Sequence, residues 1–259
     1  MAYEQIKTEI SPASVGTITL NRPDSLNALT SQMLDEIRDS VTGLPEQGAR
    51  CLLLTGAGRG FSSGADLASG GGLPEDVGLA LEQHFNPLME AIAAAPVPVV
   101  AAVNGPAAGA GASLALMADI VVAARSAYFL QAFVNIGLVP DAGATWLLPR
   151  LAGRARAIEM MMLGERIGAD KAAEWGMIAR VVDDEFLAEE SVLLATSLAR
   201  GPTRALGLIR SLARNAEQLP LTDALAAERI AQREAGQTDD FKQAVFAFLQ
   251  KRQPTFDGR

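Results

Sequence analysis

The sequence predicts an α/β protein in which a mostly parallel sheet is followed by a region built of helices. Two observations lead to this fold class. Through residues 1–185, short apolar runs alternate with helical patterns, which is the order that βαβ units produce. Beyond them the pattern is helical and is interrupted only by glycine and proline. We therefore expect a core at residues 1–185 and a helical C-terminal region at residues 186–259.

Two segments near the N-terminus are predicted to be strands that pair with each other. Residues 15–20 (VGTITL) are rich in strand-forming residues, and residues 3–10 alternate imperfectly between apolar and polar. A turn is expected at residues 21–24 (NRPD), and Thr30 is suited to cap the next helix. That helix is predicted from apolar residues at helical spacing, namely Met33, Leu34, Ile37, Val41 and Leu44.

The remainder of the core alternates in the same way. Short apolar runs predict buried strands at residues 51–55, 98–103, 119–124 and 177–182. Helices are predicted at residues 75–95 and 107–118, and the glycine-rich segment 69–73 predicts a flexible linker. Strands separated by helices favour parallel pairing, because a crossover helix returns the chain to the same edge.

Composition excludes several classes of protein. Hydrophobic residues make up 49% and charged residues 20%, as in ordinary globular domains. Cys51 is the only cysteine, so no intramolecular disulfide is possible, and its apolar run predicts a buried strand residue. The N-terminus lacks a secretory pattern and no apolar window is long enough to cross a bilayer, so we expect a cytoplasmic protein without a membrane partner. A net charge of −8 disfavours a nucleic-acid partner.

Three familiar motifs are present only in part. The glycines at 56–60 follow a predicted strand but lack the third glycine of a dinucleotide fingerprint, where Phe61 stands. Residues 60–64 (GFSSG) match a nucleophile elbow, but the only histidine, His84, lies in a predicted helix soon afterwards. We interpret His84 as a solvated or hydrogen-bonded helix residue. The sequence contains no metal-binding motif, and the glutamates near residue 189 predict a solvated helix face.

Two glycine-rich corners remain, at residues 61–67 (FSSGADL) and 105–113 (GPAAGAGAS). Each follows a predicted buried strand, and the second begins a helix. Such corners leave backbone N–H groups unpaired, and two of them converging on one carbonyl oxygen would stabilise an enolate. The alternative is that small residues simply allow tight packing of helix on strand. Two such corners on neighbouring strands favour the catalytic interpretation.

Four motifs together resemble the crotonase superfamily of enoyl-CoA hydratases and isomerases. They are LNRPDSLNAL (20–29), GRGFSSGADL (58–67), AVNGPAAGAGASLAL (102–116) and GLVPDAGATWLLPRLAGRARA (137–157). The resemblance extends over nearly the whole chain. It implies a spiral of ββα units with a C-terminal helical trimerisation region, and a homotrimer or a dimer of trimers. It also implies an acyl-CoA substrate, of which coenzyme A is a part, and no separate cofactor.

The resemblance assigns roles to individual residues. It implies that the backbone N–H groups of Ala65 and Ala110 bind the thioester oxygen. It further implies that the substrate and coenzyme A are bound by Ser25, Leu26, Ala28, Ser63, Asp66, Leu67, Gly109, Phe133 and Pro140.

The catalytic acid is where the chain departs from the hydratases of this superfamily. Hydratases use two glutamates, and the resemblance aligns those positions with Ser113 and Phe133. Asp141 instead stands in a run most similar to the subfamily that isomerises ring epoxides of phenylacetyl-CoA, where this aspartate is the catalytic acid. We expect Phe133 to exclude water from Asp141 and to raise its pKa. The alternative is that Asp141 caps the helix predicted to begin at Gly143.

These observations favour an acyl-CoA isomerase that shifts a proton and a double bond next to the thioester. A single carboxylate can remove a proton at C2 and return it at C4, or the reverse, without water. Two alternatives stay open. One is an enoyl-CoA hydratase that uses another acid, and the other is a protein that binds CoA esters without turnover.

Overall fold

The computed structural model describes residues 3–67 and 76–258, and its main sheet has six strands in the order β1-β2-β3-β4-β6-β9. β1 is antiparallel to β2, and every other neighbouring pair is parallel. The strands are β1 (Ile6–Ile10), β2 (Val15–Leu20), β3 (Cys51–Gly56), β4 (Val99–Val103), β6 (Ile120–Ala124) and β9 (Arg180–Val182). The predicted, mostly parallel sheet is therefore confirmed.

A second, three-stranded sheet lies beside the first and was not expected from the sequence. Its order is β5-β7-β8, with β5 (Ala107–Ala108) parallel to β7 (Tyr128–Leu130) and β7 antiparallel to β8 (Arg166–Gly168). The prediction of a helix over residues 107–118 is wrong at its start, because Ala107 and Ala108 pair with β7. The helix itself, α4, spans Ala110–Leu116.

Helices cover both faces of the main sheet. α1 (Ser31–Glu46) packs against β1, β2 and β3 and against α3 (Asn86–Ala94), while α8 (Leu187–Ala199) packs against β2, β3, β4 and β6. Thr30 caps α1, because its hydroxyl accepts the Met33 N–H at 3.1 Å, and the five predicted apolar residues of α1 are buried. With helices on both sides, the apolar residues of β3 and β4 are buried throughout, including Cys51.

The remaining elements of the core are short helices. The helix predicted at residues 75–95 is shorter at its start and contains a π-helical turn, η2 (Leu81–Phe85), between α2 (Gly78–Ala80) and α3. Residue 75 and the linker predicted at 69–73 lie outside the described residues. The other elements are η1 (Pro23–Ser25), η3 (Ala132–Ile136), α5 (Ala144–Ala152), α6 (Arg154–Leu163), α7 (Ala169–Glu174) and η4 (Asp184–Phe186).

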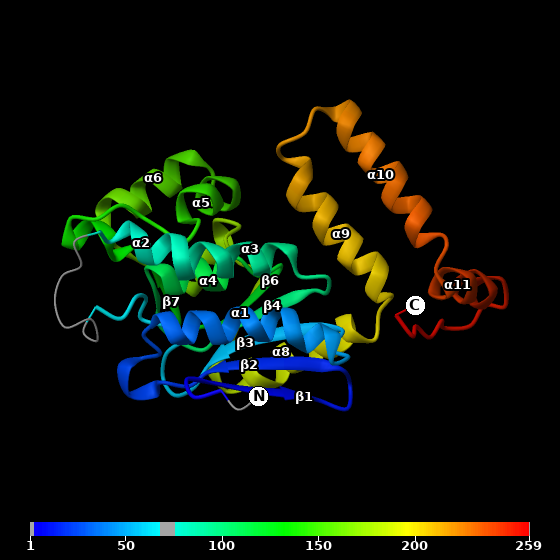
Figure 1. Cartoon of the computed structure of the whole chain (residues 1–259), viewed down its shortest axis with the longest axis horizontal. Helices are drawn as coiled ribbons and strands as arrows, with labels where there is room; N and C mark the ends of the chain where they lie inside the picture. Colours follow the sequence, from blue (N-terminus) through cyan, green and yellow to red (C-terminus); the bar gives the residue numbers. More distant parts are fainter. Residues whose placement is uncertain (1–2, 68–75, 259) are drawn as a thin grey trace.

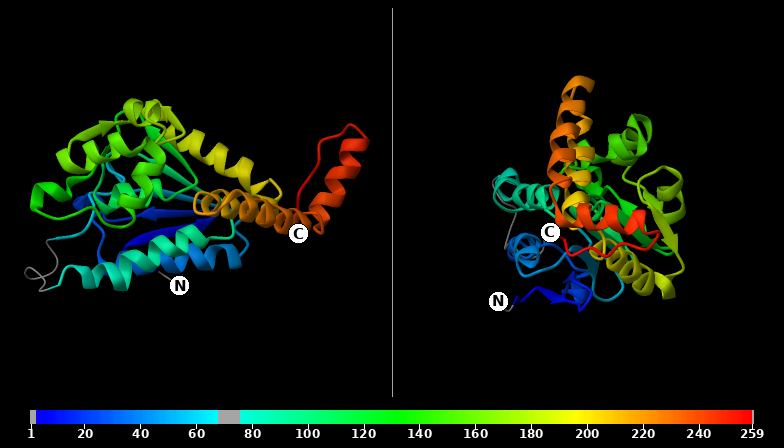
Figure 2. Two further views of the ribbon diagram at one scale, coloured as in Figure 1. Left: turned by 90° about the horizontal axis from the view of Figure 1, so that it is seen from above. Right: turned by 90° about the vertical axis from the view of Figure 1, so that its right-hand side faces the viewer.

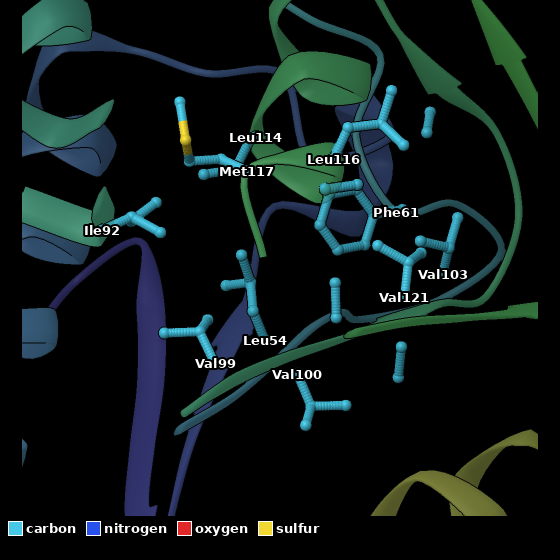
Figure 3. Packing of buried hydrophobic residues seen from close by; sticks show 14 of the residues in the cluster. Leu54, Phe61, Ile92, Val99, Val100, Val103, Leu114, Leu116, Met117 and Val121 are labelled. Atoms are coloured by element: carbon cyan, nitrogen blue, oxygen red, sulfur yellow. The ribbon is translucent and has the colours of Figure 1, made fainter. Parts of the chain in front are cut away.

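The first glycine corner is anchored in the core by a fully buried aromatic ring. Phe61 packs among Val103 of β4, Leu116 of α4 and Val121 of β6 (Figure 3). The ring therefore holds the start of the first corner against β4, α4 and β6.

Three C-terminal helices extend away from the core as an arm (Figures 1 and 2). They are α9 (Thr203–Ala216), α10 (Leu221–Ala235) and α11 (Asp239–Leu249), and α9 packs along α10. α8 also belongs to the predicted helical region but covers the sheet, so the arm begins only after it. The division of the chain at residue 185 into two functional regions stays a prediction.

An ion cluster around the buried guanidinium of Arg210 fastens the arm to the core. Asp119, just before β6, accepts hydrogen bonds from Arg210 Nε (2.8 Å) and Arg214 Nη2 (2.9 Å), both on α9. Arg210 also donates to the backbone carbonyls of Ile92, Ala93 and Ala95 at the end of α3. None of the helices in the part of the chain that the structure describes is long and apolar enough to span a membrane.

Candidate active site

The two glycine corners lie against each other. The Ala108 N–H donates to the Ser62 carbonyl at 2.9 Å, and the Ser62 N–H donates to the Pro106 carbonyl at 3.0 Å. Gly64 has φ +93°, and a Cβ added there would lie 2.8 Å from the Ala108 carbonyl oxygen and 3.7 Å from the Ala110 nitrogen. Only glycine therefore allows this close approach, which places Ala65 beside the start of α4.

The amides of Ala65 and Ala110 are available to a ligand. Within residues 3–67 and 76–258, neither N–H has a hydrogen-bond acceptor, although the residues around them pair extensively. Ala110 is the first residue of α4, and the preceding Gly109 (φ +52°) provides no capping side chain. An N–H in the first turn of a helix has no intrahelical partner, so an external oxygen could accept from it. The corners thus carry two unpaired donors near each other.

Asp141 lies in a tight turn before α5. Its carbonyl accepts hydrogen bonds from the Ala144 N–H (2.9 Å) and from Ser113 Oγ (3.3 Å), and Ala142 has a left-handed φ of +48°. The carboxylate does not cap α5, because the N-cap residue is Gly143, and within the described part of the chain no hydrogen bond joins the Asp141 side chain to the first turn. The capping alternative is therefore wrong. A left-handed backbone conformation at a residue other than glycine is strained, and such strain is typical of functional sites.

The environment of the Asp141 carboxylate favours its protonated form. Oδ1 is buried and has no hydrogen-bond partner in the described part of the chain. Burial raises the pKa of Asp141 from 3.8 to about 6, because a charged carboxylate loses hydration there. The predicted rise in pKa is confirmed, whereas its assignment to Phe133 stays a prediction. Such a carboxyl can exchange a proton near neutral pH.

Ser113 and Phe133 provide no acid at this site. Ser113 is buried on α4, three residues after Ala110, and its hydroxyl donates to the carbonyl of Asp141. Phe133 is 7% exposed, and its ring lies over Gly109, where an added Cβ would be 3.5 Å from Cζ. Ser113 lies about 4.5 Å further along the axis of α4 than Ala110, and its hydroxyl joins this helix to the turn that carries Asp141.

The residues expected to bind coenzyme A fall in segments that lie side by side. The Ser63 N–H donates to the Leu26 carbonyl at 2.8 Å, and Ser63 Oγ donates to the Ser25 carbonyl at 3.1 Å. Leu67 is 71% exposed next to them, whereas Ala28 is buried and presents little surface. The Asp66 carboxylate binds Arg22, as described below. Pro140 immediately precedes Asp141 and is half-buried.

Two buried polar residues of this region were missed by the sequence analysis. Asn27 is fully buried with φ +55°, and its side-chain amide donates to the carbonyls of Ala57 (2.9 Å) and Gly60 (2.8 Å). Its place after a turn was a usable signal, because asparagine tolerates this conformation. Gln131 is also fully buried, and neither of its amide atoms has a partner among the described residues. Nothing in the sequence distinguishes Gln131 from an ordinary loop residue.

Other candidate groups are structural. His84 Nδ1 lies 3.0 Å from Asp35 Oδ2 on α1, which confirms that His84 is a hydrogen-bonded helix residue. Burial raises the pKa of the Cys51 thiol to about 12, so this thiol is unreactive.

Comparison with known proteins identifies the group to which this fold and site belong. A model of the family described as "Enoyl-CoA hydratase/isomerase" matches residues 11–259. The chain belongs to the enoyl-CoA hydratase/isomerase family. This membership confirms the predicted crotonase-type α/β fold and the predicted class of enzyme.

Members of the enoyl-CoA hydratase/isomerase family resemble this chain along its whole length. The chain is 49% identical over 250 residues to the 1,2-epoxyphenylacetyl-CoA isomerase of Escherichia coli (strain K12), covering 95% of each protein. It is 45% identical over 259 residues to a probable enoyl-CoA hydratase of Rhodobacter capsulatus, covering 100% of each. The crystal structure of an enoyl-CoA hydratase from Bacillus anthracis superimposes with a TM-score of 0.94 at 34% identity, covering 99% of this chain and 100% of that one.

Proposed function

We propose that this protein is an acyl-CoA isomerase that shifts a proton and a double bond next to the thioester. The amides of Ala65 and Ala110 bind the thioester oxygen, and their hydrogen bonds stabilise the enolate formed when C2 loses a proton. Asp141 removes that proton and returns it at C4, or acts in the reverse direction. Coenzyme A enters as part of the substrate, and the reaction needs no separate cofactor.

One observation carries this proposal. The carboxylate of Asp141 has a buried oxygen without a partner among the described residues, while the positions aligned with the hydratase glutamates hold Ser113 and Phe133. A serine hydroxyl is a poor base at neutral pH and a phenyl ring is none, so of these three positions only 141 carries a carboxylate for proton transfer. The name of the E. coli relative supports isomerisation, including that of a ring epoxide. The acyl group is accordingly a ring-derived or a linear 3-enoyl chain.

Enoyl-CoA hydration is the second candidate, because the Rhodobacter relative is named a probable hydratase. The two reactions are separated by incubating the protein with a 3-enoyl-CoA and, separately, with crotonyl-CoA in ¹⁸O-labelled water. We expect the 3-enoyl-CoA to become a 2-enoyl-CoA without ¹⁸O in the product. Rapid formation of labelled 3-hydroxyacyl-CoA would support hydration instead. Acyl-CoA binding in calorimetry, with no product from either compound, would support a binding protein without turnover.

The pH dependence of isomerisation should follow the ionisation of Asp141. The base must be deprotonated, so we expect kcat/KM to rise with pH and to be half-maximal near pH 6. The folded state holds this proton more tightly than the unfolded chain, so the free energy of unfolding should fall as pH rises from 3.8 to about 6. Steady-state rates and urea unfolding across this range measure both trends. In an Asp141→Asn variant, the free energy of unfolding should lack this decrease between pH 3.8 and about 6.

We also propose that the arm mediates assembly into a homotrimer or a dimer of trimers. Helices α9 to α11 expose large apolar side chains that a monomer would leave in water. These side chains are Ile209, Leu221, Leu225, Ile230, Phe241, Phe246, Phe248 and Leu249. Sedimentation equilibrium of the full chain distinguishes a monomer, a trimer and a hexamer.

A further inference from the structure

An ion pair lies next to the first glycine corner. Nη1 of Arg22 is 2.8 Å from Oδ2 of Asp66, and the Asp66 side chain is only 8% exposed. The same Nη1 donates to the Ala28 carbonyl at 2.6 Å. The guanidinium therefore joins the chain around residue 28 to the residue that directly follows Ala65.

Backbone hydrogen bonds hold the same two segments together on either side of Ala65. The Leu29 N–H donates to the Gly64 carbonyl at 2.8 Å, and the Asp66 N–H donates to the Leu29 carbonyl at 3.0 Å. Ala65 lies between these two bonds and its own N–H makes neither of them. Movement of the segment at residues 28–29 would consequently reorient the Ala65 amide.

The negative charge of Asp66 gives Arg22 a second role, besides holding the two segments together. In the proposed function, negative charge develops on an oxygen bound by the Ala65 amide, one residue away from this carboxylate. An uncompensated carboxylate there would repel the developing charge, and water cannot screen a side chain that is so little exposed. The guanidinium of Arg22 neutralises it and remains charged at every relevant pH.

We propose that Arg22 is a positioning residue for catalysis, which orients the Ala65 amide and neutralises Asp66 beside the enolate oxygen. This inference rests on the proposed function. It assigns Asp66 to the oxyanion site as the partner of Arg22, in addition to the coenzyme A contact expected from the resemblance.

Four proteins test the inference: the wild type, Arg22→Gln, Asp66→Asn and the double variant. Arg22→Gln should lower kcat for 3-enoyl-CoA isomerisation by about 10²-fold, as loss of one oxyanion donor does, with little change in KM. The double variant should turn over about 10-fold faster than Arg22→Gln, because it lacks the Asp66 charge that Arg22 no longer neutralises. Equal rates for Arg22→Gln and the double variant would show that charge neutralisation plays no part.

A spectroscopic measurement separates positioning from a general structural role. A cinnamoyl-CoA bound to the wild type should absorb at longer wavelength than in water, because donors at the thioester oxygen polarise its conjugated system. Arg22→Gln should lose most of this red shift, and Arg22→Lys, which keeps the charge, should retain part of it. An unchanged red shift and kcat in Arg22→Gln would overturn the inference. If Arg22→Gln fails to fold, the same comparison is made with Arg22→Lys, where a full red shift and full kcat would overturn it.

The controls distinguish failure of this inference from failure of the proposed function. Arg125 also binds carboxylates, Asp183 at 2.7 Å and Asp170 at 2.8 Å, but its side chain is 53% exposed and both partners lie outside the two corners. Arg125→Gln makes the same change of charge and should leave kcat and the red shift unaltered. If the wild type itself shows neither isomerisation nor a red shift, the proposed function fails and the Arg22 inference fails with it.

Discussion

Replacing Asp141 by asparagine should lower kcat for 3-enoyl-CoA isomerisation by about 10²- to 10⁴-fold, the usual contribution of one general acid–base group. Asparagine has nearly the same size but cannot accept the substrate proton. KM should change little, because the amides of Ala65 and Ala110 would still bind the thioester oxygen. Steady-state kinetics at pH 8 measure both quantities. Full isomerase turnover by this variant would contradict the proposed role of Asp141.

The same substitution should not destabilise the protein. Oδ1 of Asp141 is buried without a partner in the described residues, and burial raises the pKa of this carboxyl to about 6. Above that pH the folded state must hold a poorly solvated charge, which the neutral amide avoids. We therefore expect Asp141→Asn to melt at the same temperature as the wild type or higher at pH 8. Asp170→Asn is the matched control, since this side chain is 68% exposed, and it should retain full activity.

Asp119→Ala should lower the free energy of unfolding by about 3 kcal/mol, since it removes the carboxylate that pairs with the buried Arg210 guanidinium. The Arg210 side chain is 6% exposed and that of Arg214 is 19% exposed, so neither guanidinium can regain full hydration. The Val99 N–H would also lose the Asp119 carboxylate as its acceptor at 2.8 Å. Urea unfolding at a fixed protein concentration measures the change.

Asp239→Ala provides the comparison for this loss. Asp239 binds Lys242 at 2.8 Å, but both side chains are more than half exposed, at 70% and 58%. Water screens the charges of an exposed pair of this kind, so the variant should unfold almost like the wild type. Equal destabilisation by both substitutions would mean that burial of the Arg210 guanidinium does not make the Asp119 pair more stabilising than an exposed one.

The main sheet was predictable because its strands carry their own signal. β3 and β4 are continuous apolar runs that cannot be solvated on either face, so the sequence predicts them directly. β7 and β8 have three residues each. They form because β7 pairs with β8 on one side and with β5 on the other. Ala107 and Ala108 favour a helix by propensity, but their tertiary pairing decides otherwise.

The candidate site was predictable only where a motif marks it. The glycine corners and Asp141 lie in stretches whose spacing resembles a known superfamily, and the structure brings the corners together as expected. The Arg22–Asp66 pair and the bonds of Asn27 join residues far apart in the sequence, so no local pattern indicates them. These contacts are evident only in the folded structure. The catalytic roles themselves stay predictions until the variants are measured.

The donors proposed to hold the thioester oxygen belong to the main chain, and this affects how such a protein can evolve. The side chains at 65 and 110 are single methyl groups, so exchanging them leaves both N–H groups intact unless proline is introduced. Mutation can therefore alter the acid at position 141, or the residues at 113 and 133, while both N–H groups proposed to bind the thioester oxygen are retained. The two relatives named as an isomerase and as a probable hydratase, at 49% and 45% identity to this chain, fit this expectation.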